Sequence, residues 1–481
     1  MNSLKTVLSK AIQGQIHSEK EFQKFYSVDA SSYQIIPKMI VIPKNEKDII
    51  NTIKIAKKFK TTVTVRGAGT GLVGSALNNG IILDMKNFDS IKIFKNHATV
   101  GPGTIKGKLD KKLEEKKKIF PPNPSIGSFC SVGGMLGNNS SGSRSLKYGS
   151  VIDNVIEITV IDGNGKKIIL PKDKKISNKI QSKISVDEKQ FPNVSKNSSG
   201  YRIDKIKSGK DTHKIIIGSE GTLGIITSAK LKIKDIPKKR ILFVIEYSSV
   251  KNAINDCIKI NNTNPSAIEF VDHTTLKQIN YIFQKNTECL LFVEYDEKIT
   301  LNERKIKSII SGNIVKKLTK KQDIHQWWKY RDSSLFYSLK SIKKENRIPH
   351  IIEDAAVPIE KLPKLFLILK KINKKFQTKS VIYGHIGNGN LHVRLISKRR
   401  KMSTIKKIAM EYFDEIIKIG GTITAEHGDG LARSEFIKKQ YGKTNYETFK
   451  EIKKLFDPKM ILNPGKIMTK KSTVIRNFEK I

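Results

Sequence analysis

The sequence predicts an α+β protein with two or three domains, and three observations carry that prediction. Its 481 residues exceed what a single hydrophobic core usually serves. Short β-rich segments fill the first half and are separated by loops of glycine and serine. After residue 236, helical and strand patterns alternate, which is typical of an α+β sandwich. We therefore expect domains at 1–236 and 237–429, a helical segment at 430–468 and a basic tail at 469–481.

The first glycine-rich loop runs from Arg66 to Ser75, between predicted strands at 61–65 and 81–85. Successive backbone N–H groups in such a loop form a nest that binds phosphate without a lysine. No helix follows the loop, so it is neither a P-loop nor a Rossmann fingerprint. Taken alone, the loop is equally well interpreted as a plain tight turn.

Two further runs of small residues follow, at 131–142 and 218–224, and each is expected between strands; the strands flanking the third run are predicted at 214–217 and 225–233. The sequence Asp162-Gly163-Asn164-Gly165 between them predicts a hairpin. Three such loops in one half of the chain indicate a close backbone approach to a flat or anionic ligand. The lysine-rich stretch 172–210 is predicted to be an insertion loop that mostly faces solvent.

The second half is predicted to form a ferredoxin-like α+β sandwich. Its expected elements are strands at 240–247 and 290–295, helices at 250–260, 301–311 and 322–339, a strand–helix–strand repeat from 351 to 395, and helices from 430 to 457.

The stretch His385-Ile-Gly-Asn-Gly-Asn-Leu-His392 is predicted to be a hairpin that brings two imidazoles to one end of a sheet. Glu426 and His427 follow downstream. Two histidines and one glutamate are a good ligand set for Zn²⁺ or a similar divalent ion, and they leave positions open for a substrate. His427 would then be free to act as a base. The alternative is three unrelated histidines in glycine-rich turns.

The formal net charge of +45 is extreme, with 90 basic and 45 acidic residues. Lysines are spread along the whole chain and basic residues do not alternate with aromatic ones, so a drift in composition explains the charge better than nucleic-acid binding. A weak, peripheral attraction to an anionic membrane stays open. The N-terminus has no signal peptide and no apolar stretch could span a membrane, so we expect a cytoplasmic protein.

The three glycine loops and the histidine segments together resemble the p-cresol methylhydroxylase-type FAD-binding domain and the FAD-linked oxidase domain of the vanillyl-alcohol oxidase superfamily. The likeness covers about residues 30–468 and includes Asp457-Pro458 to Asn463-Pro464-Gly465-Lys466. It implies that FAD is bound by Arg66, Gly67, Ala68, Gly69, Thr70, Gly71, Ser75, Pro122, Ser131, Gly133, Gly134, Asn138, Ser141, Gly142, Tyr148, Glu220, Gly221, Gly224, Ile226 and Asn463. Some branches attach FAD through a histidine of the first loop; this loop has none, so we expect FAD to be bound non-covalently.

The resemblance further implies oxidation of a 2-hydroxy acid such as D-lactate, glycolate or D-2-hydroxyglutarate, with hydride transfer to FAD. The expected metal ligands are His385, His392 and Glu426, for Zn or else Mn or Fe, and His427 is the expected base. Arg331 matches a substrate-binding arginine of the family, and the alternative role for Arg331 is a surface ion pair with Asp332 or a neighbour. Arg394 and Asn390 are further candidates for binding the substrate.

The sequence has three cysteines and no CxxC pair, so it encodes no iron–sulfur cluster. Electrons are therefore expected to pass to a separate iron–sulfur subunit, a quinone, a cytochrome or oxygen. Two other classes stay open: a non-redox flavin transferase similar to alkylglycerone-phosphate synthase, and a basic binding protein on a degenerate flavin fold. The oligomeric state is open as well, with a homodimer as one candidate.

Overall fold

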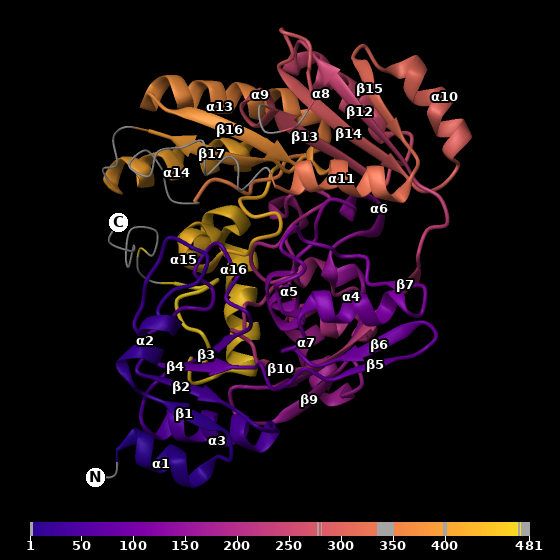
Figure 1. Ribbon diagram of the computed structural model, residues 1–481. Coiled ribbons are helices and arrows are strands. Elements are labelled where there is room, and N and C mark those ends of the chain that lie inside the picture. Colours follow the sequence, from indigo (N-terminus) through magenta and orange to yellow (C-terminus); the bar gives the residue numbers. More distant parts are fainter. Residues whose placement is uncertain are drawn as a thin grey trace.

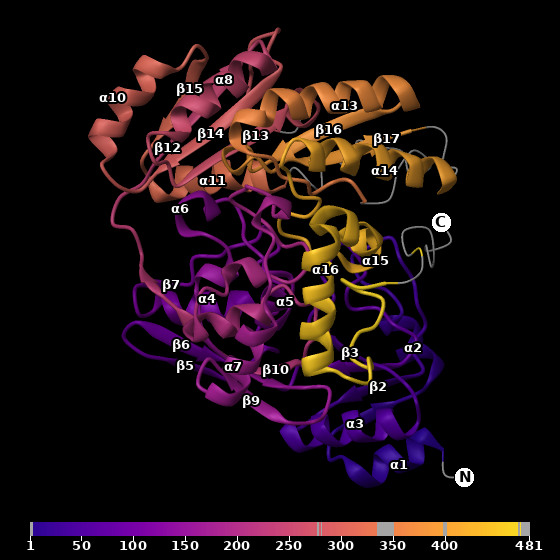
Figure 2. The same cartoon turned by 180° about the vertical axis from the view of Figure 1, so that it is seen from behind.

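The computed structural model of the protein describes residues 3–276, 279, 281–333, 351–397, 402–469 and 472. Two halves are stacked in Figure 1, with helix α16 (yellow, Ile437–Phe456) lying beside the N-terminal segments in the lower half. The rear view in Figure 2 shows the same arrangement. The chain thus leaves the lower half, forms the upper one, and returns. In the described part of the chain, no helix has the length and apolar character needed to cross a membrane.

The lower half contains two sheets. The first has the order β1 (Gln15–His17), β2 (Met39–Ile42), β4 (Ile81–Asp84) and β3 (Val63–Arg66), and β2, β3 and β4 are parallel. Helices α1 (Leu4–Ala11) and α3 (Glu46–Lys58) pack on this sheet, and α2 (Lys20–Tyr26) follows β1. Near the other end of the chain, Leu462 pairs in parallel with Val63, so the C-terminal segment adds to the edge of this sheet.

The second sheet is antiparallel, with the order β5 (Ile91–Ile93), β6 (His97–Val100), β10 (Ile225–Lys232), β8 (Val155–Ile161) and β9 (Lys167–Leu170). The predicted hairpin is the β8–β9 connection. The core of this region also takes residues from α4 (Lys106–Glu114), α5 (Val132–Asn138), α7 (Lys174–Lys183) and α16. Shorter elements are β7 (Lys118–Ile119) paired with β11 (Lys234–Asp235), α6 (Ser145–Tyr148), and the 3₁₀ helices η1 (Val151–Asp153), η2 (Glu188–Gln190), η3 (Ile203–Lys205) and η4 (Gly209–Ile215).

Three expectations for the lower half are wrong, the third of them only in part. The second small-residue run is mainly the helix α5, which begins where the Ser131 hydroxyl accepts a hydrogen bond from the Gly134 N–H. The expected strand at 214–217 is instead the end of η4 and a turn, because Ser208 and Asp211 form a capping box that starts a 3₁₀ helix. The stretch 172–210 is not a loop throughout, because α7 packs in the core and residues 196–203 are buried, whereas most of its other residues face solvent at least in part.

The upper half is built on a six-stranded antiparallel sheet. Its order is β15 (Asn313–Leu318), β12 (Ile241–Tyr247), β14 (Cys289–Tyr295), β13 (Ala267–Asp272), β16 (Lys379–Gly384) and β17 (His392–Ile396). The first four strands, with α8 (Val250–Asn261) and α10 (Ile299–Ile309) as crossovers, have the strand order of a ferredoxin-like unit. β16 and β17 extend that unit beside β13.

Within the upper half, the sequence pattern missed two strands, β13 and β15, and placed a strand near residue 351 where the structure has irregular backbone. The remaining helices are α9 (His273–Leu276), α11 (Lys321–Asp332), η6 (Ile359–Lys361), α13 (Leu362–Phe376) and α14 (Met402–Lys418). The predicted extension of α11 to residue 339 and almost all of the basic tail lie outside the described residues.

Side chains alternate between the two faces of the upper sheet. Phe243 and Val393 belong to the core under α8, α13 and α14, whereas Val244 belongs to the core under α11. By the same alternation, Glu269 on β13, and His392 and Arg394 on β17, face the α11 side. Figures 1 and 2 both show α11 between the upper sheet and the lower half. This face therefore places polar side chains where the two halves meet.

Candidate active site

The hairpin of β16 and β17 brings His385 and His392 together. Tyr383 pairs with His392 across the hairpin, and the short helix η7 (Ile386–Asn388) closes its end. Gly389 has a φ of +67°, and a Cβ there would lie 1.9 Å from the Val357 carbonyl oxygen, so the turn requires glycine at this position. The two imidazole centroids are 5.2 Å apart.

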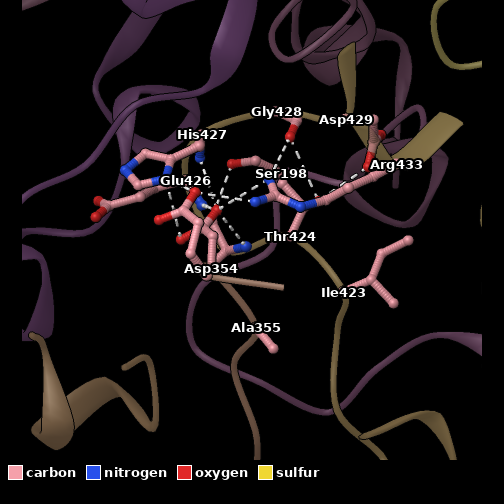
Figure 3. Close-up of polar contacts among 12 residues, drawn as sticks. Ser198, Asp354, Ala355, Ile423, Thr424, Glu426, His427, Gly428, Asp429 and Arg433 are labelled. Atoms are coloured by element: carbon pink, nitrogen blue, oxygen red, sulfur yellow. Dashed lines mark hydrogen bonds and ion pairs between the residues drawn. The ribbon is translucent and has the colours of Figure 1, made fainter. Parts of the chain in front are cut away.

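Glu426 and His427 reach the same site because the backbone there curls around a buried carboxylate. Asp354 Oδ2 accepts the N–H groups of Ala425, Glu426 and His427 at 3.1, 3.0 and 2.8 Å. Figure 3 shows Asp354 at the centre of this turn. Residues 425–428 are not a strand, so the alternation that would send neighbouring side chains to opposite faces does not apply.

Two imidazole nitrogens converge on one carboxylate oxygen. Glu426 Oε1 lies 2.8 Å from His385 Nε2 and 3.4 Å from His392 Nε2, and all three side chains are buried. His385 Nδ1 lies 2.7 Å from Glu269 Oε1, which fixes that nitrogen as the donor. His385 Nε2 is then the ring nitrogen that faces Glu426 Oε1, and with His392 Nε2 beside that oxygen the three atoms form one set of possible metal ligands. The donor set therefore fits a divalent metal ion.

Within the described residues, a second combination of ligand atoms overlaps this one. Atoms of Asp354, His392, Glu426 and His427 lie within 4.8 Å of one another. However, Asp354 Oδ2 already accepts three backbone N–H groups and its Oδ1 accepts from Asn390 at 3.3 Å. His427 Nδ1 is likewise 2.7 Å from Glu353 Oε1. The carboxylate oxygen and two nitrogens of the first set have fewer competing partners.

The second oxygen of Glu426 is held by the lower half of the molecule. Glu426 Oε2 accepts from the Ser141 hydroxyl, from Gly142 N–H at 3.0 Å and from Lys196 Nζ at 3.1 Å. Burial raises the pKa of Glu426, but Lys196 and His385 outweigh burial and bring that pKa well below its usual range. Glu426 is therefore a carboxylate whose other oxygen, Oε1, faces the two histidines. Ser141 and Gly142, expected beside the flavin, lie against this ligand.

His427 is oriented by a buried acid. Its Nδ1 donates to Glu353 Oε1, its ring stacks on His392 with centroids 5.0 Å apart, and its side chain is 22% exposed. Burial lowers the pKa of His427, but Asp354 and Glu353 outweigh burial and raise that pKa to about 9. Nε2 is the ring nitrogen left to exchange a proton, and a bound dication would lower its pKa.

The two arginines of the site are buried beside Tyr383. Arg331 is 3% exposed and forms an ion pair with Glu269, and its Nη1 also lies 3.9 Å from Asp332 Oδ1, so the expected ion pair is present but Arg331 is buried rather than on the surface. Its Nε has no hydrogen-bond partner among the described residues. Arg394 Nε lies 3.4 Å from the Tyr383 hydroxyl, and its Nη1 is also without a partner in the described part of the chain.

Asn390, the third expected substrate contact, is completely buried. Its Nδ2 donates to the Ala355 carbonyl at 3.1 Å and to Asp354 Oδ1 at 3.3 Å, and Lys196 Nζ lies 3.5 Å from its Oδ1. These bonds tie the turn between the two histidines to the turn that carries Glu426.

The predicted flavin loops meet around Asn463. Its Nδ2 donates to the carbonyls of Ser75 and Glu220 at 2.9 and 2.6 Å, and its Oδ1 accepts from Thr64 at 3.0 Å. The second loop joins them, because Glu220 N–H donates to the Gly137 carbonyl at 2.9 Å. One residue near the C-terminus thus gathers the first and third loops.

The backbone of these loops leaves little room for side chains. A Cβ at Gly67 would lie 2.0 Å from Ser131 Oγ, and a Cβ at Gly221 in the third loop would lie 2.5 Å from Val65 Cγ1. Ser75 Oγ is buried and has no partner within the described residues. A cradle of this kind, with a spare buried polar atom, fits the phosphates of a dinucleotide.

Not every expected flavin contact lies in this cradle. The Tyr148 hydroxyl donates to Asp296, and its neighbour Lys147 forms an ion pair with that aspartate at 2.6 Å, so both dock the upper half. Gly224 packs against Val160, and Ile226 is paired with Val160 in the second sheet.

Two family models match the chain in sequence. The C-terminal domain of FAD linked oxidases matches residues 236–467, and the FAD binding domain matches residues 37–170. The chain belongs to the FAD-linked oxidase family. Its FAD-binding domain supports FAD as the cofactor.

Known relatives of this FAD-linked oxidase are similar to it in sequence along most of the chain. The glycolate oxidase subunit GlcD of Bacillus subtilis (strain 168) is 29% identical over 467 residues, covering 92% of both chains. The mitochondrial D-lactate dehydrogenase [cytochrome] of Arabidopsis thaliana is 26% identical, covering 97% of this chain and 80% of that protein. Among solved structures, an alkyldihydroxyacetonephosphate synthase has a TM-score of 0.67 at 18% identity, covering 94% of this chain and 83% of the other, which shows the shared fold.

Sequence reasoning missed several residues of this FAD-linked oxidase site, namely Lys196, Glu269, Glu353, Asp354 and Arg433. Arg433 is completely buried and donates to Glu353 and to the Gly428 carbonyl, as Figure 3 shows for the latter bond. A detectable signal was present: Glu269 is a single charge inside an apolar strand, and Glu353-Asp354 interrupt an apolar stretch. Buried charges of this kind persist only when they are paired or bind a ligand.

Proposed function

We propose that the protein is an FAD-dependent dehydrogenase that oxidises a D-2-hydroxy acid to the 2-oxo acid and passes the electrons to a separate acceptor. The observation that carries this proposal is the convergence of His385 Nε2 and His392 Nε2 on Glu426 Oε1, at 2.8 and 3.4 Å. Glu426 of this cluster also accepts hydrogen bonds from Ser141 and Gly142, which belong to the second predicted flavin loop. The names of the relatives, a glycolate oxidase subunit and a D-lactate dehydrogenase, support the same substrate class.

We propose that His385, His392 and Glu426 hold one divalent metal ion, with zinc as the first choice and manganese or iron as alternatives. When bound, such an ion lowers the pKa of a coordinated hydroxyl, and FAD accepts a hydride from the adjacent carbon. Glu426 connects the two proposed sites. Its Oε2 is bound by residues of the lower half, which contains the flavin loops, while its Oε1 faces the histidines of the proposed metal site.

His427 is the proposed base for the hydroxyl proton. Glu353 holds Nδ1 as the donor, so Nε2 accepts the proton from the substrate. The resulting imidazolium lies beside two carboxylates, Glu353 and Asp354, that stabilise its charge. The arrangement therefore favours proton transfer toward the protein.

Arg331 and Arg394 are the proposed partners of the substrate carboxylate. Each keeps a buried N–H nitrogen that no described residue occupies. Asn390 lies between the two histidines in sequence and, in this proposal, orients the substrate or a ligand. Burial favours such charge-assisted contacts because water competes less well there.

FAD is proposed to be bound without a covalent bond, because the loop from Arg66 to Ser75 has no histidine. The electron acceptor is proposed to be a separate iron–sulfur subunit, a quinone or a cytochrome. The sequence contains three cysteines, which is too few for a four-cysteine cluster.

Anaerobic titration of the yellow protein tests the function. D-lactate, glycolate and D-2-hydroxyglutarate are each added, and loss of flavin absorption near its visible maximum is recorded. Bleaching by at least one of these acids, with an equivalent of 2-oxo acid formed, is the expected result. A flavin-loaded protein that none of the three bleaches would contradict the proposal and favour a non-redox transferase on the same fold.

A further inference from the structure

Glu269 is a buried carboxylate that contacts both His385 and Arg331, and it belongs to none of the sequence motifs described above. It lies on β13, is completely buried, and faces α11. Glu269 Oε1 lies 2.7 Å from His385 Nδ1, and Oε2 forms an ion pair with Arg331. Arg331 Nη2 in turn lies 3.5 Å from His385 Nδ1, which closes a small triangle of charged groups.

We propose that Glu269 is a positioning residue for the metal site, acting through His385; the inference rests on the metal ligands of the proposed function. A carboxylate that accepts the Nδ1 proton fixes the tautomer and the orientation of the imidazole, and raises the basicity of Nε2. His385 Nε2 is the nitrogen that faces Glu426 Oε1 at 2.8 Å. Glu269 thus sets both the direction and the strength of this ligand.

The ion pair with Arg331 keeps Glu269 in its charged form. Both side chains of this pair are buried, at 3% and 1% exposed, so each compensates the charge of the other. Arg331 keeps its Nε free of partners among the described residues, so the guanidinium can contact Glu269 and a further anion at once. Glu269 therefore fixes the position of His385, the proposed metal ligand, relative to Arg331, the proposed partner of the substrate carboxylate.

Two single substitutions separate this role from a structural one. Glu269→Gln and Arg331→Met break the same buried ion pair, but only Glu269→Gln removes the anionic partner of His385. The dissociation constant for Zn²⁺ is measured by competition with a chromophoric chelator on the flavin-loaded protein. FAD content and melting temperature are recorded for every variant.

The expected result is that Glu269→Gln binds Zn²⁺ about 10–100-fold more weakly, the usual cost of losing such a partner. Arg331→Met should bind Zn²⁺ at least as tightly as the wild type, because a cation near the site has been removed. Excess Zn²⁺ should restore flavin reduction in Glu269→Gln. Equal weakening in both variants, or an unchanged constant in Glu269→Gln, would overturn the proposal.

The double variant Glu269→Gln/Arg331→Met covers the case in which Glu269→Gln does not fold. It leaves no unpaired buried charge, so folding is less affected. It should show the same 10–100-fold loss of Zn²⁺ affinity as Glu269→Gln, and wild-type affinity in the double variant would overturn the role of Glu269. A wild-type protein that binds no Zn²⁺ would contradict the metal of the proposed function itself, which is a distinct outcome.

Discussion

Lys196 and Glu426 form an ion pair at 3.1 Å with side chains only 1% and 7% exposed. They are 230 residues apart in sequence, and Lys196 belongs to the lower half, where the flavin cradle lies. Burial lowers the pKa of Lys196, while Glu426 opposes that shift. The proposed metal ligand is thus neutralised by a lysine when no other cation is present.

Replacing Lys196 by Met should therefore destabilise the metal-free protein more than the metal-loaded one. Removing one partner of a buried ion pair costs about 3–5 kcal/mol, because the other charge is left uncompensated. A divalent ion on Glu426 would replace the missing charge and reduce that cost. Urea unfolding with and without Zn²⁺ measures the difference. The control is Lys321→Met, whose exposed pair with Glu114 should contribute about 1 kcal/mol or less.

His392→Ala should remove the metal and the activity but leave FAD in place. His392 lies at the proposed metal site, whereas the cradle around Asn463 uses other segments. Elemental analysis and the visible spectrum of the same sample measure both. Stoichiometric zinc, manganese or iron retained in the variant would show that His392 is not a ligand.

His427→Ala should keep metal and FAD but slow flavin reduction about 10²–10⁴-fold, the usual contribution of a general base. Single-turnover stopped-flow measures the rate. Glu426→Ala is the paired control and should lose the metal. If His427→Ala loses its metal instead, His427 is a ligand; if it reduces flavin at the wild-type rate, it is not the base.

FAD should leave the protein on acid precipitation, since the first loop offers no histidine for a covalent bond. The absorption spectrum of the supernatant is compared with that of the redissolved pellet. Yellow colour that stays with the pellet contradicts non-covalent binding.

His213 should make the protein less stable in mild acid. Its Nε2 donates to the Val155 carbonyl at 3.2 Å, and its Nδ1 is buried without a partner among the described residues. Burial, with a contribution from Lys214, lowers the pKa of His213 from 6.5 to about 4. The unfolded chain binds this proton more readily, so the stability that the neutral ring contributes is present above pH 6.5 and falls as the pH drops toward 4.

The size of this effect is at most about 3 kcal/mol. It is measured as the difference in unfolding free energy between wild type and His213→Gln, which keeps a donor for Val155. The advantage of the wild type should shrink between pH 7 and pH 4.5. A difference that stays constant over that range would contradict a neutral, buried His213.

The sequence pattern predicted the first and third glycine loops, the histidine hairpin and several elements of the upper half, because glycine spacing and apolar periodicity are local properties. It did not find the partners of the ligands. Lys196 lies within the stretch 172–210, which as a whole is predicted to face mostly solvent, and nothing in the sequence shows that it is buried against Glu426. That contact depends on how the two halves pack against each other, and such packing produces no periodic pattern of apolar residues in either segment. Nor does the sequence show how the neighbours Glu426 and His427 reach one site, which the structure explains by Asp354 accepting the N–H groups of both.

The pairing of Leu462 with Val63, and the bonds of Asn463 to Ser75 and Glu220, have a consequence for biosynthesis. The edge of the first sheet and the seat of the dinucleotide are incomplete until residue 463 has left the ribosome. At roughly 5–20 residues per second, that is about 10–45 s after residue 235 emerges. During this interval the N-terminal region waits with an open sheet edge, and the upper half, which is contiguous in sequence, can fold first.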